Sequence, residues 1–575
     1  MGEGLKAIHE KINSAKMDNV DKTEFQDAYQ LRFIGKNYAK FIADLPTETL
    51  LVPNTEWNNL SENLNSQNIF ITGDNLPVLK HLQNAYYNSV DVIYIDPPYN
   101  TGSDGFIYND KFEFTDEQLK DTLSLTDDEI KRLHSINGKS SHSAWLTFMY
   151  PRLKIASKLL KDTGVIFINI DYNEQANLKL LCDEIFGERN FQREIIWRIG
   201  WVSGFKSGEN IDNFVRNHDT ILYYTKCKDK VFFNKTNAYT TQEDFGSRFN
   251  SFKDKNSQKV INPKQVLLKD LIDMGIDKKK AQEFINKADT IGLPEKYPIE
   301  DTWNCSSYDK LNSIAIESFS HEKVSKMLGI DEFKGQKSIK LISRIIKSSP
   351  NKNAVVLDFF GGSGSTAHAV MKLNSEDGGN RRWILVQLDE PTWEVDKSGN
   401  KKAKENFEKT YNAGYETIDQ VSRARIEYAA KELGDTSGFK HYYIKEPNAV
   451  TLDKITEFDP KQPALIAEDM VEELGGEDVL LTTWLVADGY KLTDKPQEID
   501  LAGYRAYYCD NSVLYLIKQG WGKEQTQTLL NLAGKNKLNL NTIICFGYSF
   551  TLESMEELEI NVNQSLNHVK VEKRY

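Results

Sequence analysis

The chain is poor in cysteine and has no long apolar run. Its cysteines are few, scattered and odd in number, and no Cys-x-x-Cys pair occurs: Cys182, Cys227, Cys305, Cys509 and Cys545. This pattern indicates neither a zinc site nor a disulfide framework, and it fits a reducing compartment. No apolar run approaches the roughly 20 residues that a membrane-spanning helix needs. Residues 1–16 also lack the apolar core of a signal peptide. We therefore expect a cytoplasmic protein that does not enter a membrane.

Other signatures are missing as well. The string most similar to a P-loop, Gly335-Gln336-Lys337-Ser338, lacks the Gly-Lys pair and the strand before it. We find no helicase or nuclease motif, no internal repeat and no low-complexity tract. At 575 residues the chain is long enough for three or four domains.

Negative charge exceeds positive charge, but unevenly. The formal net charge of −12 argues at first against a nucleic-acid partner. Residues 226–300, however, hold 15 Lys/Arg against 11 Asp/Glu, whereas residues 441–575 hold 13 against 21. The basic segment is therefore either a phosphate-binding surface or an ordinary solvated one.

The most informative feature that is present is Asp96-Pro97-Pro98-Tyr99. It follows the apolar run 92–95, which is typical of a buried strand that stops at its carboxyl end. Catalytic and ligand-binding groups of open α/β sheets lie at such ends. An acid, a proline carbonyl and an aromatic ring suit a flat base with an exocyclic amine. The alternative is a rigid strand stop without chemistry.

Alternating strands and helices surround this motif. We expect strands at 68–72, 91–95, 164–170, 194–197, 220–224, 354–357 and 383–388. We expect helices at 77–85, 145–160, 337–347 and 420–433. Trp145 reads as a core residue. Asp74 precedes the first helix and is either its cap or a ligand contact. Phe106 and Tyr108 are either loop packing or part of a site.

A glycine turn follows the strand at 354–357. Asp358-Phe359-Phe360-Gly361-Gly362-Ser363-Gly364 leads from this strand into a helix, which is the arrangement of nucleotide-binding folds. Asp389 lies 25 residues after Gly364, near the place of a ribose-binding acid. Alone, this turn fits a nicotinamide cofactor or a simple tight turn. Combined with the tetrapeptide, it indicates methyl transfer from S-adenosylmethionine to an exocyclic amine on a circularly permuted sheet.

The motifs and their order resemble the beta-class amino-methyltransferases of DNA, in which DPPY precedes a target recognition domain and FxGxG follows it. Within that class the chain most resembles the modification (Mod) subunits of type III restriction-modification systems. The closer match lies in the sequences GDNL (73–76), WLTFMYPRL (145–153), FFGGSGSTAH (359–368) and FGYSF (546–550). The fold implied is a circularly permuted Rossmann-like α/β methyltransferase sheet.

The resemblance also implies residue roles. Asp96 and the Pro97 carbonyl would accept the two hydrogens of a flipped adenine N6, with Pro98 keeping the motif rigid and Tyr99 stacking on the base. Asp96 is also an expected cofactor-binding residue. The others are Asp74, Lys337, Ser338, Asp358, Phe360, Gly362, Gly364 and Asp389. Gln387 stands where many members have Glu, so the ribose contact is assigned to Asp389 or Glu390.

The expected domains are a helical segment at 1–66, a catalytic part at 67–231 and a target recognition domain at 232–300. A cofactor-binding part at 301–436 and a C-terminal α/β domain for dimerisation or partner binding at 437–575 would follow. The partners implied are double-stranded DNA, a second copy of the chain and a separate restriction subunit that cleaves.

Several functions stay open. A solitary methyltransferase without a restriction partner and an N4-cytosine methyltransferase are close variants, although the latter more often has Ser at the Asp96 position. A nicotinamide-dependent oxidoreductase would leave DPPY unexplained. A protein-glutamine methyltransferase needs Asn-Pro-Pro-Tyr with the cofactor motif first. A DNA-binding module without catalysis would not need an intact DPPY.

Overall fold

The computed structural model describes residues 31–101, 116, 119–120, 125–137, 141–198, 218–231, 301–303, 323–331, 336–447 and 470–575, with short pieces between 239 and 298. The predicted recognition domain at 232–300 and the loop that carries Phe106 and Tyr108 lie mostly or wholly outside these residues. Among the helices of the described part, none combines the length and apolarity needed to cross a membrane.

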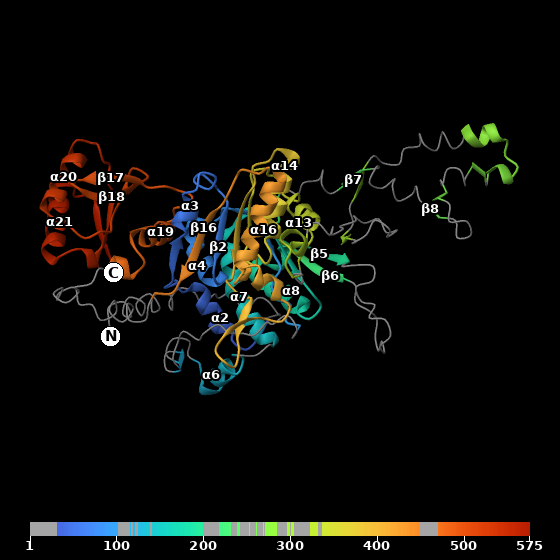
Figure 1. Ribbon diagram of the computed structural model, residues 1–575, viewed down its shortest axis with the longest axis horizontal. Helices are drawn as coiled ribbons and strands as arrows, with labels where there is room; N and C mark the ends of the chain where they lie inside the picture. The colour runs from blue at the N-terminus through green and yellow to red at the C-terminus, as the bar shows by residue number, and fades with distance from the viewer. Residues whose placement is uncertain are drawn as a thin grey trace.

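A ten-stranded sheet forms the centre of the molecule (Figure 1), in the order β1-β16-β2-β13-β12-β3-β4-β6-β5-β11. Its first five strands are β1 (Leu50–Pro53), β16 (Lys440–Lys445), β2 (Ile69–Thr72), β13 (Arg382–Gln387) and β12 (Val355–Asp358). The others are β3 (Val90–Ile95), β4 (Leu160–Ile170), β6 (His218–Thr225), β5 (Phe191–Arg198) and β11 (Thr302–Trp303). The run from β16 to β4 is parallel throughout.

The permuted sheet predicted from the motif order is confirmed. Strand β12, which leads into the glycine turn, pairs in parallel with β3, which leads into the tetrapeptide, with Leu357 opposite Ile93. On the other side β13 pairs with both β12 and β2. All residues of β2, β3 and β12 are buried, because helices cover both faces of a parallel sheet.

Two helical layers enclose the sheet. One apolar core contains α2 (Lys36–Asp44), α4 (Asn75–Ala85), α7 (His142–Leu159) and α8 (Gln175–Phe186). The other contains α13 (Ile339–Ile346), α14 (Ser365–Asp377) and α16 (Ile418–Leu433). Each helix presents an apolar stripe to the sheet, which is the general solution for this architecture.

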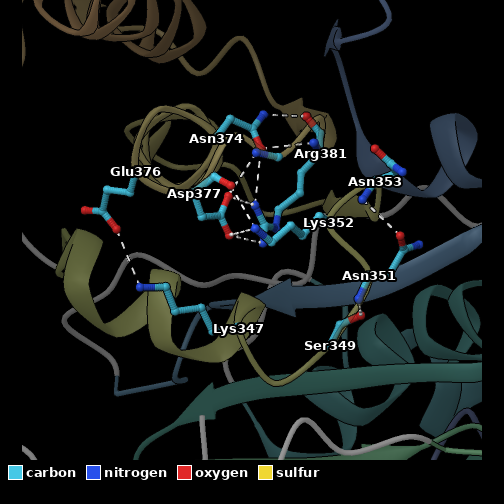
Figure 2. Close-up of polar contacts among 10 residues, drawn as sticks. Lys347, Ser349, Asn351, Lys352, Asn353, Asn374, Glu376, Asp377 and Arg381 are labelled. Carbon is cyan, nitrogen blue, oxygen red and sulfur yellow. Dashed lines mark hydrogen bonds and ion pairs between the residues drawn. The ribbon is translucent and has the colours of Figure 1, made fainter. Parts of the chain in front are cut away.

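The amino ends of β12 and β13 are held by polar contacts (Figure 2). Arg381, just before β13, pairs with Asp377 at the end of α14, with Nη2 2.8 Å from Oδ2. Asn374 donates to the Arg381 carbonyl at 2.9 Å, and Lys352 donates to the Asp377 carbonyl at 2.8 Å. These contacts fix the strand ends that lie opposite the motif-bearing edge.

The domain boundaries expected at 66 and 437 are wrong in one respect. Strand β1 is an edge strand of the main sheet, antiparallel to β16, and β16 pairs in parallel with β2. The central sheet therefore draws on both the supposed N-terminal helical segment and the supposed C-terminal domain. The edge position also explains Pro53, since a proline is tolerated where one side of a strand has no partner.

The C-terminal part forms its own five-stranded sheet (Figure 1). Its strands are β17 (Gln497–Leu501), β18 (Tyr504–Cys509), β19 (Val513–Leu516), β20 (Thr542–Phe546) and β21 (Lys570–Arg574). Helices α20 (Lys523–Gly534) and α21 (Leu552–Ser565) share one apolar core with it. Helix α19 (Glu477–Ala487) shares another with it, and that core includes Leu50 of β1. Helix α19 thereby joins the two sheets.

Candidate active site

The tetrapeptide lies directly after β3, at the carboxyl edge of the sheet, as predicted. Strand β3 is buried at every position, so the chain reaches the surface only at Asp96. The neighbouring strands β12 and β4 end at Asp358 and Ile170 on the same edge. Residues from three parallel strands therefore converge there, which is the usual position of a site in an open α/β sheet.

Lys337 joins the tetrapeptide from the segment before α13. Its Nζ lies 3.1 Å from Oδ2 of Asp96 and donates to the Tyr99 hydroxyl at 2.7 Å. The Tyr99 hydroxyl in turn donates to Oδ1 of Asp96 at 2.7 Å. A second carboxylate, Asp219 of β6, lies 3.9 Å from the same Nζ. The lysine is thus the positive centre of an acidic pocket.

Burial makes this pocket electrostatically sensitive. The pKa of Tyr99 is raised well above its usual value, first by burial and then by the charges of Asp96 and Asp219. Burial raises the pKa of Tyr94 on β3 in the same way. Both tyrosines therefore remain protonated, so Tyr99 serves as a hydrogen-bond donor to Asp96 rather than as a base.

Trp145 supports the motif from α7. Its side chain is fully buried, which agrees with its reading as a core residue. Its indole Nε1 nevertheless donates to the Pro98 carbonyl at 2.7 Å. A buried indole N–H needs a partner, and here that partner is the backbone of the tetrapeptide. Trp145 is therefore both a core residue and a support of the site.

The glycine turn lies beside the tetrapeptide, at the end of β12. Gly362 and Gly364 have φ angles of 52° and 79°, a region that glycine adopts without strain. The Gly362 N–H donates to Oε1 of Gln387 at 2.7 Å. Ser422 of α16 donates to the Gly362 carbonyl at 2.5 Å. Helix α14 begins immediately after the turn and directs its N-terminus to this edge.

Asp358 is the buried acid at the base of this turn. Burial raises its pKa to about 7, although hydrogen bonds from the Thr366 hydroxyl and the Phe360 N–H act in the opposite direction. Phe360 is half-buried and packs near Phe148, with ring centroids 6.1 Å apart. The turn therefore offers the partly exposed Phe360 ring and Gly362, beside a buried carboxyl group whose pKa is raised to about 7.

The segment Gly73-Asp74-Asn75 connects helix α7 with the glycine turn. Asp74 caps α4 by accepting from the Leu76 N–H at 2.7 Å, and it also pairs with buried Arg152 at 3.1 Å. Arg152 Nε donates to Oδ1 of Asn75 at 2.5 Å, and Asn75 Nδ2 donates to the Phe359 carbonyl at 2.7 Å. The cap reading of Asp74 is confirmed, and its carboxylate remains partly exposed at this edge.

The remaining predicted residues differ in position. Ser338 is buried and precedes the first residue of α13. Asp389 and Glu390 are exposed beyond β13, and Glu390 lies 3.5 Å from Lys404. Gln387, not either acid, contacts the glycine turn. The cofactor roles of these residues, like those of the other predicted cofactor-binding residues, stay predictions.

Sequence reasoning missed Arg425. This arginine of α16 is fully buried, and its Nη1 donates to Oγ of Ser363 at 2.7 Å and of Ser365 at 2.6 Å. It therefore fixes the end of the glycine turn and the start of α14 from helix α16. The available signal was a charge on an apolar helix face, because Ile418, Val421 and Ile426 are buried on the same face.

Comparison with known proteins agrees with this geometry. A family model described as DNA methylase matches residues 90–395, and one described as the type III R-M EcoP15I C-terminal domain matches residues 475–571. The chain is 40% identical to the StyLTI Mod subunit of a type III restriction-modification enzyme from Salmonella typhimurium, over 97% of this chain and 91% of that one. It is 35% identical to the EcoP15I Mod subunit of Escherichia coli, over 93% and 89%. It is 34% identical to the EcoPI Mod subunit of Escherichia phage P1, over 93% and 89%. The chain therefore belongs to the DNA methylase family and, within it, to the modification (Mod) subunits of type III restriction-modification enzymes.

Proposed function

We propose that this protein transfers a methyl group from S-adenosylmethionine to the N6 amine of adenine in duplex DNA, with Asp96 and the Pro97 carbonyl as the groups that receive the amine. The observation that carries the assignment is the parallel pairing of β3 with β12, which brings the tetrapeptide beside the glycine turn. A base held at one motif and a methyl donor held at the other would lie at adjacent strand ends.

The tetrapeptide supplies acceptors for an exocyclic amine. The Pro98 carbonyl already accepts from Trp145, so the Pro97 carbonyl is the backbone acceptor that we assign. Asp96 accepts one amine hydrogen and Pro97 the other, which directs the nitrogen lone pair away from both. The amine nitrogen would take the methyl group that S-adenosylmethionine supplies, with the thioether product as the leaving group, and the surplus amine proton would pass to water. The base must first leave the DNA stack to reach these groups.

The glycine turn and its surroundings fit the cofactor. The turn is closely packed, since a Cβ on Gly364 would lie 3.0 Å from the Ser422 carbonyl. We assign the cofactor to the pocket formed by Asp358, Phe360, Gly362 and Gly364, with contributions from Asp74, Lys337, Ser338 and Asp389. When bound, S-adenosylmethionine supplies an electrophilic methyl group. The chain's own residues orient it and exclude water, with Phe360 giving an apolar wall.

The insertion and the C-terminal part have partner roles in this proposal. Residues 232–300 lie in the sequence between β6 and β11, two strands toward the same end of the strand order. Their excess of lysine and arginine suits contacts with DNA phosphates, while their polar side chains would read base edges. We assign the C-terminal domain to contacts with a second copy of the chain or with a restriction subunit.

A labelling experiment tests the proposed function. The full-length protein is incubated with duplex DNA and methyl-labelled S-adenosylmethionine, and the DNA is digested to nucleosides. Label in N6-methyl-2′-deoxyadenosine is the expected result. Label in N4-methyl-2′-deoxycytidine would redirect the substrate assignment, and absence of label from any DNA would refute the function.

An Asp96→Ala variant tests the catalytic assignment. It should abolish transfer while leaving cofactor binding, measured by calorimetry, largely intact. Asp162→Ala is the matched control, because this exposed carboxylate pairs with Lys230 on the surface, 2.6 Å away. Transfer that survives Asp96→Ala would contradict the role of Asp96.

A further inference from the structure

A buried carboxylate lies close to the tetrapeptide without belonging to it. Glu174 precedes the first residue of α8, and its side chain is fully buried. Its Oε1 accepts from Asn100 Nδ2 at 2.5 Å and contacts His142 Nδ1 at 2.7 Å. Its Oε2 accepts from Asn177 Nδ2 at 2.7 Å. A carboxylate removed from water is tolerated only when its oxygens are satisfied in this way.

The chemistry of the groups suggests the direction of these hydrogen bonds. A carboxylate oxygen accepts, and Nδ1 of His142 donates to Glu174 in the tautomer that carries its hydrogen there. The Asn100 and Asn177 amides likewise present their N–H groups. Glu174 therefore gathers three donors from three parts of the chain: the residue after the tetrapeptide, the start of α7 and the first turn of α8.

Asn100 is held in a conformation that links this cluster to the site. It directly follows Tyr99 and has a φ of 58°, a left-handed conformation that asparagine adopts more readily than most residues. Its side-chain amide reaches Glu174 from this conformation. The segment 96–100 is thus anchored at three points: Lys337 at Asp96 and Tyr99, Trp145 at Pro98, and Glu174 at Asn100.

We infer that Glu174 is a positioning residue for methyl transfer, which holds the exit of the tetrapeptide through Asn100. The inference rests on the proposed role of Asp96 and Pro97 in receiving the amine. Glu174 does not touch the reacting atoms. It fixes the backbone turn after Tyr99, and thereby the distance between the two amine acceptors and the glycine turn.

Catalytic groups must be held to within a fraction of an ångström, and a displacement of about 1 Å can cost on the order of 100-fold in rate. The Lys337 contacts hold the side chains of Asp96 and Tyr99, and the Trp145 contact holds the Pro98 carbonyl. Without the Glu174 contact, the backbone that follows Tyr99 can move while the fold remains intact.

The test reverses the polarity of one hydrogen bond. Asn100→Asp places a carboxylate against Glu174 and should lower the single-turnover rate by about 100-fold, because like charges at this distance repel. The double variant Glu174→Gln with Asn100→Asp restores a donor–acceptor pair in the opposite direction. The single-turnover rate of this double variant should be at least about tenfold higher than that of Asn100→Asp alone.

Three readouts separate positioning from loss of structure. Asn100→Gly accommodates the positive φ but removes the amide, so it should lower the rate while the melting temperature stays near that of the wild type. The dissociation constant of S-adenosylmethionine, measured by calorimetry, should be unchanged in all variants. Glu188→Gln, an exposed carboxylate near the end of α8, is the control and should behave as the wild type.

The outcomes distinguish the two hypotheses. If the wild type labels no DNA, the proposed function fails. If the wild type is active but Asn100→Gly and Asn100→Asp transfer at its rate, the role of Glu174 is overturned. A double variant no faster than Asn100→Asp alone would overturn it too.

Discussion

Lys337 gives the sharpest test of how the pocket is held. Replacing it with methionine keeps an unbranched apolar stem, shorter by the terminal amine, and removes the charge. In the wild type its Nζ lies 3.1 Å from Asp96, 3.9 Å from Asp219 and in hydrogen-bond contact with Tyr99. Lys337→Met therefore leaves two neighbouring acids without their shared cation.

The magnitude follows from these distances. Two unit charges 3.1 Å apart attract by about 5 kcal/mol at an effective dielectric constant of about 20. The cost of desolvating the lysine offsets part of this attraction, but removing one partner of a buried pair still costs about 3–5 kcal/mol. Asp96 is 23% exposed, so water screens part of the loss, and we expect about 3 kcal/mol in the free energy of unfolding.

The transfer rate should fall because Asp96 and Tyr99 are no longer held in position. Tyr99 loses its donor and Asp96 its counter-charge, so we expect single-turnover transfer to fall by about 100-fold or more. Lys337→Arg keeps the positive charge but changes the shape of the side chain, so its transfer rate should lie between those of the wild type and Lys337→Met. Thermal unfolding and transfer of labelled methyl groups are the two assays.

Lys347→Met is the matched control. Lys347 lies at the other end of α13 and is 3.5 Å from Glu376 on α14 in an exposed pair (Figure 2). Such pairs contribute at most about 1 kcal/mol, so its stability and rate should match those of the wild type. A Lys337→Met protein with wild-type melting and wild-type transfer would show that Lys337 does not hold Asp96 and Tyr99 in place.

Three further predictions concern the cofactor side. Gly364→Ala, at φ 79° and close to the Ser422 carbonyl, should lower stability by about 1–3 kcal/mol and weaken S-adenosylmethionine binding in calorimetry. Arg425→Met should weaken cofactor binding while preserving the methyl-transfer step at saturating cofactor, because the arginine holds the turn and touches no substrate in this proposal. The pKa of Asp358 is raised to about 7, so as pH rises from about 4 to 7 the unfolded chain ionises there before the folded one does, and folded stability falls. Asp358→Asn should therefore flatten the dependence of melting temperature on pH in that window, and an unchanged slope would contradict the burial of a titrating acid.

The main strands were predictable because parallel, doubly covered strands are uninterrupted apolar runs. Strands β2, β3, β4 and β12 were expected within a few residues of their observed bounds. Strands β1 and β16 were not placed in the sheet. Each is short and borders an irregular segment, and their pairing joins Leu50 with Lys445, so no local pattern could reveal it.

The candidate site was predictable only where one segment carried the whole signal. The tetrapeptide is one continuous stretch of sequence, and so is the glycine turn. Their side-by-side position was predicted from the order of the two motifs. The contacts of Trp145 with Pro98 and of Arg425 with Ser363 join separate segments. A sequence shows that these side chains are large or charged, but not which backbone they reach.

The two motifs lie far apart along the chain, so bringing them together has an entropic cost that the fold must offset. Bringing chain ends together across about 260 residues instead of about 30 costs roughly 2 kcal/mol in loop-closure entropy. Against this stand the β12–β3 and β13–β2 pairings, two shared apolar cores and the Asn75–Phe359 hydrogen bond. Burying a single large apolar side chain contributes about 1.5–3 kcal/mol, so a few of the many buried residues offset the whole entropic cost. The order of the motifs is therefore free to vary while the sheet order is not, because the chemistry depends on neighbouring strand ends. Asp96 can meet the glycine turn from the first part of the chain because β3 lies beside β12.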